Sequence, residues 1–232
     1  MKQTVLCCVL LLGLSTLLLT CAGGLEQPSL RCDAVDDKRL VTFPFTGTAD
    51  TALAWIQDEY GLTAEDIKHD LSADRAQVLI KWKPLPNREN DALVWVDGRE
   101  SASVSVTWQD QAPTLADALR CLGDPPLYRA YYAQYPEAIW TFLELWYPER
   151  GFMVTAHVPR KIVGFTNDQA IGNVSYVRPG PPEDLATRFF WAVDRGSEHY
   201  TQILRSTKLW PSDIRKITID QRVEQWPIKV AP

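Results

Sequence analysis

The sequence lacks the residue spacings by which many enzymes are recognised. Its three histidines form no HxxxH, HxH or HExxH pair, and its five cysteines form no CxxC pair. No GxSxG, P-loop or GxGxxG sequence is present. These absences exclude the enzyme groups that such motifs define, and the sequence predicts neither a metal site nor a cofactor.

Basic residues are also sparse. The chain has 24 Lys and Arg against 29 Asp and Glu, giving a formal net charge of -5. It contains no cluster of five or more basic residues, so we expect no nucleic-acid partner. The composition is 46% hydrophobic and 23% charged, which excludes wholesale disorder and a multi-span membrane protein.

One long apolar run is present, at the N-terminus. Lys2 precedes an almost unbroken apolar stretch from Val5 to Thr20, and the small residues of 22–24 follow it. A basic start, an apolar core and small residues are typical of an export signal. We therefore expect residues 1–20 to be a signal peptide.

The end of this signal resembles a bacterial lipobox. In Leu18-Leu19-Thr20-Cys21 the cysteine stands where diacylglycerol and acyl chains such as palmitate are attached, although Thr20 departs from the usual small residue. We expect Cys21 to carry the lipid of a membrane lipoprotein, because two acyl chains anchor a protein firmly. Cleavage after Ala22 and a retained apolar anchor are the alternatives.

The remaining cysteines suggest a disulfide. Export places the chain in an oxidising compartment, and once Cys21 is acylated the exported part retains only Cys32 and Cys121. The sequence therefore predicts a Cys32–Cys121 disulfide, with two buried thiols as the alternative. Residues 21–31 are predicted to be a tether, because Gly and Pro interrupt regular structure there.

Residues 32–232 are predicted to form a single α+β domain, with a possible subdivision near residues 160–180. Asp97-Gly98 and the Pro148–Gly151 turn indicate two hairpins. The predicted fold has antiparallel hairpins packed against several short helices. The predicted helices are 48–60, a short one from Thr63, 114–122, 183–193 and 198–206, and the predicted strands are 77–82, 93–96, 101–108, 139–147, 152–158, 173–178 and 215–220.

Glu144 is the most unusual carboxylate, because it interrupts an apolar strand. Trp140, Phe142 and Trp146 share its strand face, and a carboxylate among aromatic rings can acquire a raised pKa. Paired with His157, it would be the acid–base pair of an envelope hydrolase. The alternatives are a position at the sheet rim or a salt bridge with Arg129 or Arg150.

Nine tryptophans are present, and three recur at equal intervals in predicted strands: Trp82, Trp95 and Trp108. Neighbouring strands would gather them into a platform for sugar rings or peptide side chains. Core packing is the alternative interpretation. The tyrosine-rich segment 127–135 is either a partner surface or the surface of an amphipathic element.

Residues 114–158 contain a helix, then Leu122-Gly123-Asp124-Pro125, then a hairpin whose first strand is rich in aromatics. This order resembles the helix–Leu-Gly-x-Pro–hairpin modules of uncharacterised bacterial envelope lipoproteins and of the small lipoproteins of outer-membrane assembly. Pro126 departs from the pattern, which covers about a fifth of the chain. The resemblance implies a module that binds partners and performs no chemistry.

Together these features predict a non-catalytic, lipid-anchored protein on the extracytoplasmic side of a cell membrane. Its partner is expected to be another protein or a membrane complex in which it serves as an accessory subunit. An envelope hydrolase using Glu144 and His157, and a sugar- or peptide-binding module using the three tryptophans, are the alternative functions.

Overall fold

The computed structural model describes residues 32, 35–71, 77–95, 103–189 and 195–225. The chain divides into two compact units, Met1–Arg31 and Cys32–Pro232, of which only the second contains described residues. The predicted signal peptide, Cys21 and the tether therefore lie outside the described residues. The turn predicted at Asp97-Gly98 lies outside them as well.

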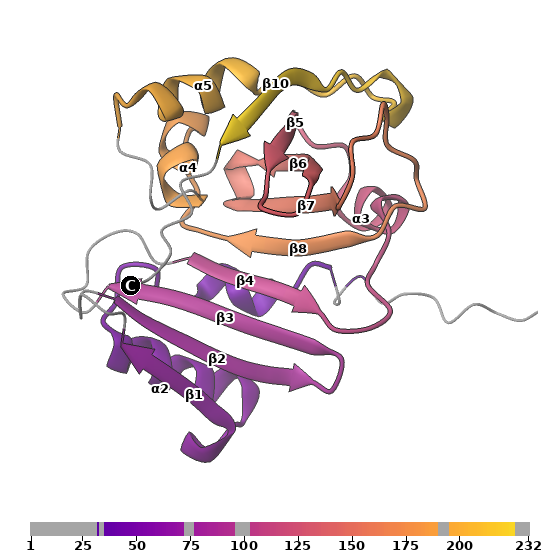
Figure 1. Cartoon of the computed structure of the whole chain (residues 1–232). Helices are drawn as coiled ribbons and strands as arrows, with labels where there is room; N and C mark the ends of the chain where they lie inside the picture. Colours follow the sequence, from indigo (N-terminus) through magenta and orange to yellow (C-terminus); the bar gives the residue numbers. More distant parts are fainter. Residues whose placement is uncertain (1–31, 33–34, 72–76, 96–102, 190–194, 226–232) are drawn as a thin grey trace, which may run out of the picture. The chain divides into compact units, whose positions relative to one another are not determined.

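The second unit has the predicted α+β fold, and its described part contains one large sheet and four short α-helices (Figure 1). The strands are β1 (Ile67–Leu71), β2 (Gln77–Leu85), β3 (Arg88–Trp95), β4 (Ser103–Trp108), β5 (Leu127–Gln134), β6 (Ile139–Tyr147), β7 (Phe152–Val158), β8 (Ile171–Tyr176), β9 (Lys208–Leu209) and β10 (Asp220–Gln225). The helices are α2 (Ala49–Tyr60), α3 (Leu115–Leu122), α4 (Pro182–Phe189) and α5 (Glu198–Ser206).

The order of the strands is nearly a palindrome. Along the sheet it runs β1-β2-β3-β4-β8-β7-β6-β5-β10, and β9 pairs with β5. In each half a helix, α2 or α3, precedes four strands that pair in turn, and the two last strands, β4 and β8, join antiparallel. Since β10 pairs with β5, the chain before and after residues 160–180 contributes to one sheet.

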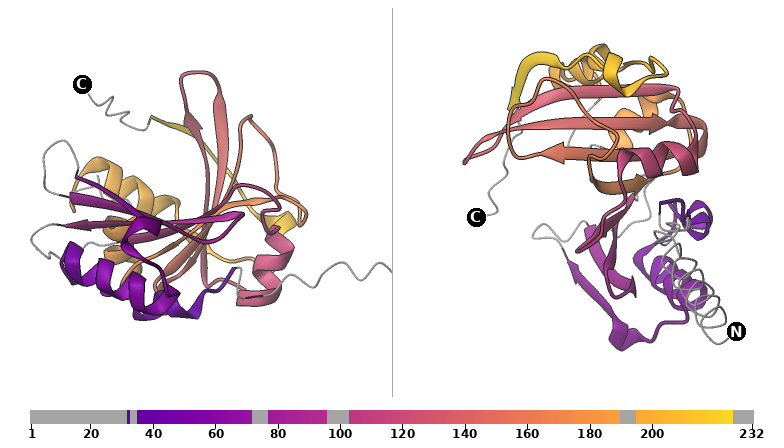
Figure 2. Two further views of the ribbon diagram at one scale, coloured as in Figure 1. Left: turned by 90° about the horizontal axis from the view of Figure 1, so that it is seen from below. Right: turned by 90° about the vertical axis from the view of Figure 1, so that its right-hand side faces the viewer.

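The helices lie on both sides of this sheet (Figure 2). One face, here called the core face, carries the most buried strand residues, and α2 packs on it through Tyr60 against Trp82. The other face, here called the open face, is covered at one end by α4 and α5. There, side chains of both helices pack on Trp146 and Met153.

A buried hydrogen-bond network fixes the start of the domain to the core face. The carboxylate of Asp37 accepts a bond of 2.8 Å from Arg88 Nη2 and one of 3.0 Å from the Tyr60 hydroxyl. The Tyr176 hydroxyl accepts from the Asp37 backbone N–H and donates to the Val35 carbonyl oxygen. Because Arg88 and Tyr176 come from β3 and β8, this network spans both halves of the sheet.

Local sequence signals explain most elements. Thr48, Thr114 and Ser197 are the N-caps of their helices, each accepting a bond from a backbone N–H in the first turn. The β6–β7 hairpin is also confirmed, with a 3₁₀ turn at Pro148–Arg150. Gly151 follows at φ +67°, and a Cβ there would lie 2.3 Å from the Val177 carbonyl oxygen, so the turn requires glycine.

Three local predictions are wrong. The strand expected at 215–220 is instead a 3₁₀ turn at Ile214–Lys216, because the Asp213 side chain accepts from the Arg215 N–H and bends the chain. The ordered strand follows at Asp220–Gln225. The helix expected from Thr63 is a single 3₁₀ turn that leads into β1.

The third error concerns the end of β2. The strand expected at 77–82 should stop at Lys83-Pro84, yet β2 continues to Leu85. The register with β3 shifts between Trp82 and Leu85. Proline is tolerated at such an irregularity because it donates no ladder hydrogen bond there.

The predicted disulfide is present. Cys32 and Cys121 are bonded, with Cα atoms 5.3 Å apart, and their sequence separation is 89 residues. The bond joins the first described residue to the last turn of α3, which is the helix that precedes the second half of the sheet.

Replacing both Cys32 and Cys121 with alanine should lower the free energy of unfolding by about 4 kcal/mol, because the unfolded chain loses a long covalent loop. Urea denaturation of both proteins under oxidising conditions measures this difference. The wild type treated with reductant is the control and should behave like the variant. Equal midpoints for the oxidised wild type and the variant would show that the bond does not stabilise the domain.

Candidate binding site

A buried charge network lies under the covered end of the open face. We call it the Arg129 network, and it consists of Arg129 on β5, Glu144 on β6, Glu224 on β10 and Ser206 at the end of α5. All four side chains are at most 4% exposed. Arg129 and Glu144 are cross-strand partners, so the strand register itself places the cation beside the first carboxylate.

Each guanidinium nitrogen of Arg129 has an acceptor in this network. Nε donates to Ser206 Oγ at 2.8 Å, Nη1 lies 3.4 Å from Glu144 Oε2, and Nη2 donates to Glu224 Oε1. The Tyr131 hydroxyl donates to Glu144 Oε1 at 2.8 Å, and the Trp146 indole N–H donates to Oε2 at 3.2 Å. Both oxygens of Glu144 are therefore occupied by partners within the protein.

Two carboxylates share one guanidinium in this network. Burial raises the pKa of Glu144 and of Glu224, and Arg129 opposes that rise in each case. Burial acts against the charge of Arg129 as well, but the neighbouring carboxylates more than compensate and raise its pKa. The arrangement thus keeps a cation inside the fold and ties β5, β6, β10 and α5 together.

An aromatic cluster continues from this network toward the uncovered end of the open face. It consists of Tyr131 and Tyr135 from β5 and the residue after its end, Trp140 and Phe142 from β6, and His157 from β7. The Tyr131 ring stacks on Phe142 with centroids 5.3 Å apart, and Phe142 is also nearly parallel to Tyr135 and Trp140. Tyr131 is buried, whereas the other four rings are partly exposed.

Tyr131 connects the two groups. Its hydroxyl bonds Glu144, its ring stacks on Phe142, and the Arg129 guanidinium carbon lies 3.9 Å from its ring centroid. The buried charges therefore hold the ring on which the exposed aromatic residues stack. This support makes the cluster a preorganised surface rather than a set of separate side chains.

Gly172 leaves space for the imidazole ring of His157 at the edge of the aromatic cluster. A Cβ on Gly172 would lie 2.3 Å from His157 Cε1 and 2.5 Å from Nδ1, so the ring lies directly against the β8 backbone. Its centroid is 5.3 Å from that of Trp140. Burial lowers the pKa of His157, which favours the neutral ring in this apolar setting.

Polar side chains continue the open face beyond His157. Thr155, Asn173 and Thr107 follow one another across β7, β8 and β4 in register. Asn173 donates to Ser175 Oγ at 2.9 Å, which lies 3.3 Å from Ser105 Oγ. Asp91 on β3 lies opposite Ser105. Burial raises the pKa of Asp91 to about 6, although the positive charge of Lys81 opposes this rise.

The predicted acid–base pair is not formed. Glu144 lies opposite Thr155. His157 instead lies opposite Phe142, two residues further along the same pair of strands. Glu144 is 1% exposed and bonded to Arg129, Tyr131 and Trp146, which matches the salt bridge considered as its alternative. The ring of His157 contacts Trp140 and Phe142 instead.

The predicted tryptophan platform is wrong. Trp82 is 1% exposed and packs beneath Tyr60 on the core face, where no ligand reaches it. Trp108 lies opposite the buried Arg88. Trp95 pairs with Gln77, and its side chain lies outside the described part of the structure. Equal spacing in sequence did not bring three indoles to one exposed surface.

Segment 127–135 is not an exposed partner surface either. It forms β5, in which Tyr128, Arg129, Tyr131 and Tyr132 are buried. Of its tyrosines only Tyr135, just beyond the strand, contributes a partly exposed ring to the aromatic cluster. The sequence signal that could have found the cluster is the run of aromatic residues in β6, the first strand of the β6–β7 hairpin. By itself this run indicates only that aromatic rings pack around Glu144.

Comparisons with protein-family models, curated proteins and solved structures found no match to this chain. The candidate site is therefore defined by the geometry of this chain alone. Within the described ranges, no three His, Cys, Asp or Glu side chains gather as a metal site would require. No described helix has both the length and the hydropathy needed to cross a bilayer.

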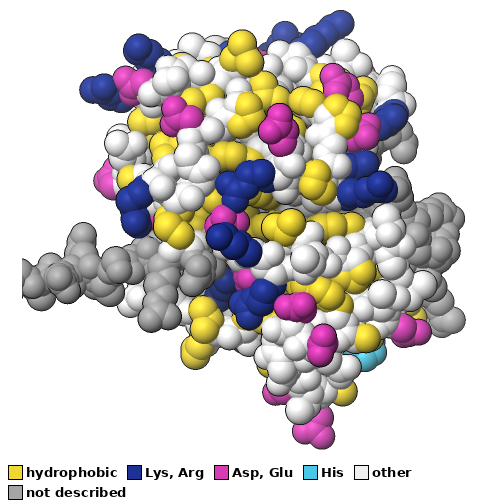
Figure 3. Space-filling view, turned by 180° about the vertical axis from the view of Figure 1, so that it is seen from behind, with side chains coloured by type: hydrophobic (Ala, Val, Ile, Leu, Met, Phe, Trp, Pro, Cys, Tyr) yellow, Lys and Arg dark blue, Asp and Glu magenta, His cyan; other side chains and the backbone are white. Residues whose placement is uncertain are grey.

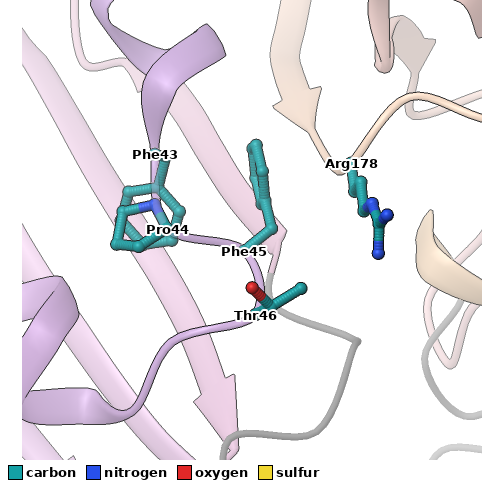
Figure 4. A pocket seen from close by; sticks show the side chains of 5 residues that line it. All are labelled: Phe43, Pro44, Phe45, Thr46 and Arg178. Carbon is teal, nitrogen blue, oxygen red and sulfur yellow. The ribbon is translucent and has the colours of Figure 1, made fainter.

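Two hollows lie elsewhere on the described surface. One, of about 360 Å³, lies between the chain at 43–46 and Arg178 (Figure 4). The other, of about 780 Å³, is lined by Tyr132, Lys161 and apolar residues of 162–163 and 217–219. The face seen from behind mixes acidic and basic side chains (Figure 3). Neither hollow combines buried charge with exposed rings as the open face does.

Replacing Arg129 with methionine should lower the free energy of unfolding by about 3–5 kcal/mol, because two buried carboxylates lose their shared cation. Chemical denaturation at neutral pH measures the change. Arg120→Met is the matched control, since Arg120 is 53% exposed in its pair with Asp117 and should change stability by less than about 1 kcal/mol. Equal effects of the two substitutions would mean that the network does not hold the strands together.

Proposed function

We propose that this protein is a non-catalytic, lipid-anchored protein of the cell envelope that binds a protein partner through its aromatic cluster. The observation that carries the proposal is the cluster itself. Four partly exposed rings, Tyr135, Trp140, Phe142 and His157, stand together on a sheet face and are held by a buried charge network. Aromatic anchors with rigid support are the usual centres of protein interfaces.

The packing of the rings favours a protein partner over a sugar. Phe142 is within 24° of parallel to Tyr131, Tyr135 and Trp140, so the rings direct much of their faces toward one another. A sugar ring needs an open aromatic face. Ring edges near the partly exposed Asn173 and Thr107 instead suit a surface that combines apolar contacts and hydrogen bonds.

Anchoring at the membrane is supported by the sequence and by the disulfide. The apolar run ending at Cys21 is typical of an exported lipoprotein, and the Cys32–Cys121 bond is typical of a protein that folds in an oxidising compartment. Cys21 lies eleven positions before Cys32, so a lipid there would hold the domain close to the membrane surface.

A hydrolase is the weaker candidate on the same residues. Its acid would be Glu144, whose two oxygens already accept bonds from Arg129, Tyr131 and Trp146. A general acid must reach the substrate proton within hydrogen-bond distance. The occupied carboxylate is better suited to positioning Tyr131 than to proton transfer.

Site-specific photocrosslinking tests the proposal in the cells that make the protein. A benzophenone amino acid at position 135 should give a discrete crosslinked protein, and Trp140→Ala should reduce its yield about tenfold, because anchor residues dominate interface energy. The probe at Leu85, which is 50% exposed on β2, is the matched control and should give no such product. A Cys21→Ser chain should leave the membrane fraction.

The two parts of the proposal fail separately. The same products from positions 135 and 85, or a yield unaffected by Trp140→Ala, would remove the aromatic cluster as the binding surface. Membrane retention of the Cys21→Ser chain would remove the lipid anchor and leave the binding surface untouched.

A further inference from the structure

The near-palindromic sheet has two comparable edges, and the described strands cover only one of them. The first strand of each four-stranded half is the outer one, β1 in one half and β5 in the other. On β5 the C-terminal part of the chain adds β10 in parallel, and β9 also pairs with it. Among the described residues, β1 pairs only with β2 and ends the sheet (Figure 1).

The β1 edge is exposed along most of its length. Ile67 is buried, whereas Lys68, His69, Asp70 and Leu71 are exposed. Leu71 is 59% exposed, which makes it one of the most exposed large apolar side chains in the described structure. An open edge strand offers unpaired backbone donors and acceptors to another strand.

The residues of β1 complement a second copy of themselves. Read along the strand they are apolar, cationic, His, anionic and apolar: Ile67, Lys68, His69, Asp70 and Leu71. In an antiparallel pair centred on His69, Lys68 lies opposite Asp70 of the second copy and Ile67 lies opposite Leu71. Opposite charges in such cross-strand positions are favourable.

The charges already present on β2 favour the same arrangement. Within the protein, Lys68 lies opposite Lys81, and like charges in register repel. Asp70 lies opposite Leu79 and has no opposite charge in its cross-strand position. A second copy would place an aspartate on the free side of each Lys68 and a lysine on the free side of each Asp70.

We propose that β1 is a homodimer edge, on which β1 of a second copy pairs antiparallel about a two-fold axis at His69. The contact is isologous and closes after two copies, and it joins the two sheets into one. Charged residues on an edge strand also serve to prevent pairing. A single lysine on β1 would prevent pairing in this way. Lys68 and Asp70, however, are placed symmetrically about His69, so Lys68 of each copy lies opposite Asp70 of the other and their charges neutralise each other.

The interface is small, because each copy contributes five residues of backbone pairing. Contacts of this size give weak, concentration-dependent association. Any anchoring of the chain to a membrane raises the effective concentration and strengthens the dimer without new contacts. The edge pairing itself is independent of the aromatic cluster and of its partner.

Charge exchange between copies tests the proposal with the full-length protein in detergent, by sedimentation equilibrium over a range of concentrations. Lys68→Asp alone and Asp70→Lys alone should each weaken self-association about tenfold or more, because each introduces two like-charge pairs. An equimolar mixture of the two variants should recover the dimer, since both cross-strand positions then pair an aspartate of one variant with a lysine of the other. Lys38→Asp, at an exposed lysine away from β1, is the matched control and should leave the dimer unchanged.

A cysteine scan in isolated membranes tests the register. Under mild oxidation, His69→Cys should form an inter-chain disulfide with itself, whereas Lys68→Cys should form one only when mixed with Asp70→Cys. The wild type treated in the same way gives the background from its own cysteines. Unfolding midpoints equal to that of the wild type show that these exposed substitutions leave the fold intact.

The proposal is overturned if the wild type is monomeric at all concentrations and His69→Cys gives no product above background. It is also overturned if the mixture of charge variants remains monomeric while the wild type dimerises, since another surface must then hold the copies. Equal crosslinking of Lys68→Cys and His69→Cys with themselves would contradict the antiparallel register.

Discussion

The pairing of β4 with β8 is the interaction on which the rest of the structure depends. It joins two four-stranded antiparallel halves into one sheet, with Val104 and Val106 facing Tyr176 and Val174 in a fully buried position. We call this β4–β8 pairing the seam. Burial of its apolar side chains and continuous backbone hydrogen bonding both stabilise the contact between the two halves. The Asp37 network then bonds Arg88 of one half and Tyr176 of the other, so the N-terminal segment closes over the same seam.

The two faces of the joined sheet are covered differently. Among the described residues, α2 and α3 lie on the side of the core face, and α4 and α5 cover one end of the open face. The covered end contains Arg129 with its two carboxylates, and the uncovered end contains the rings that Tyr131 links to them. A buried charge network is costly unless every group is paired. Here it positions an exposed surface that the sequence alone did not reveal.

The elements with local causes could be predicted from sequence. The N-caps Thr48, Thr114 and Ser197 and the turn ending at Gly151 depend on residues close in sequence, and the structure confirms the helices and the hairpin expected there. The features that the sequence did not predict, or predicted wrongly, depend on contacts between residues that are far apart in the chain. Glu224 reaches Arg129 from 95 positions away, and Trp82 is buried because α2 packs over it. The near-palindromic strand order also depends on pairing between distant segments, and β10 begins only after the turn at Asp213.

Native-state hydrogen exchange of the β4 and β8 amides tests most directly whether the sheet is one cooperative unit. If the seam joins the halves, the amides of Val106 and Val174 exchange only through global unfolding, with the same opening free energy as the slowest amides of β2 and β6. The account would be contradicted if β1–β4 opened at a clearly lower free energy than β5–β8 and the seam amides opened with them. That result would make the two halves separate folding units that merely touch.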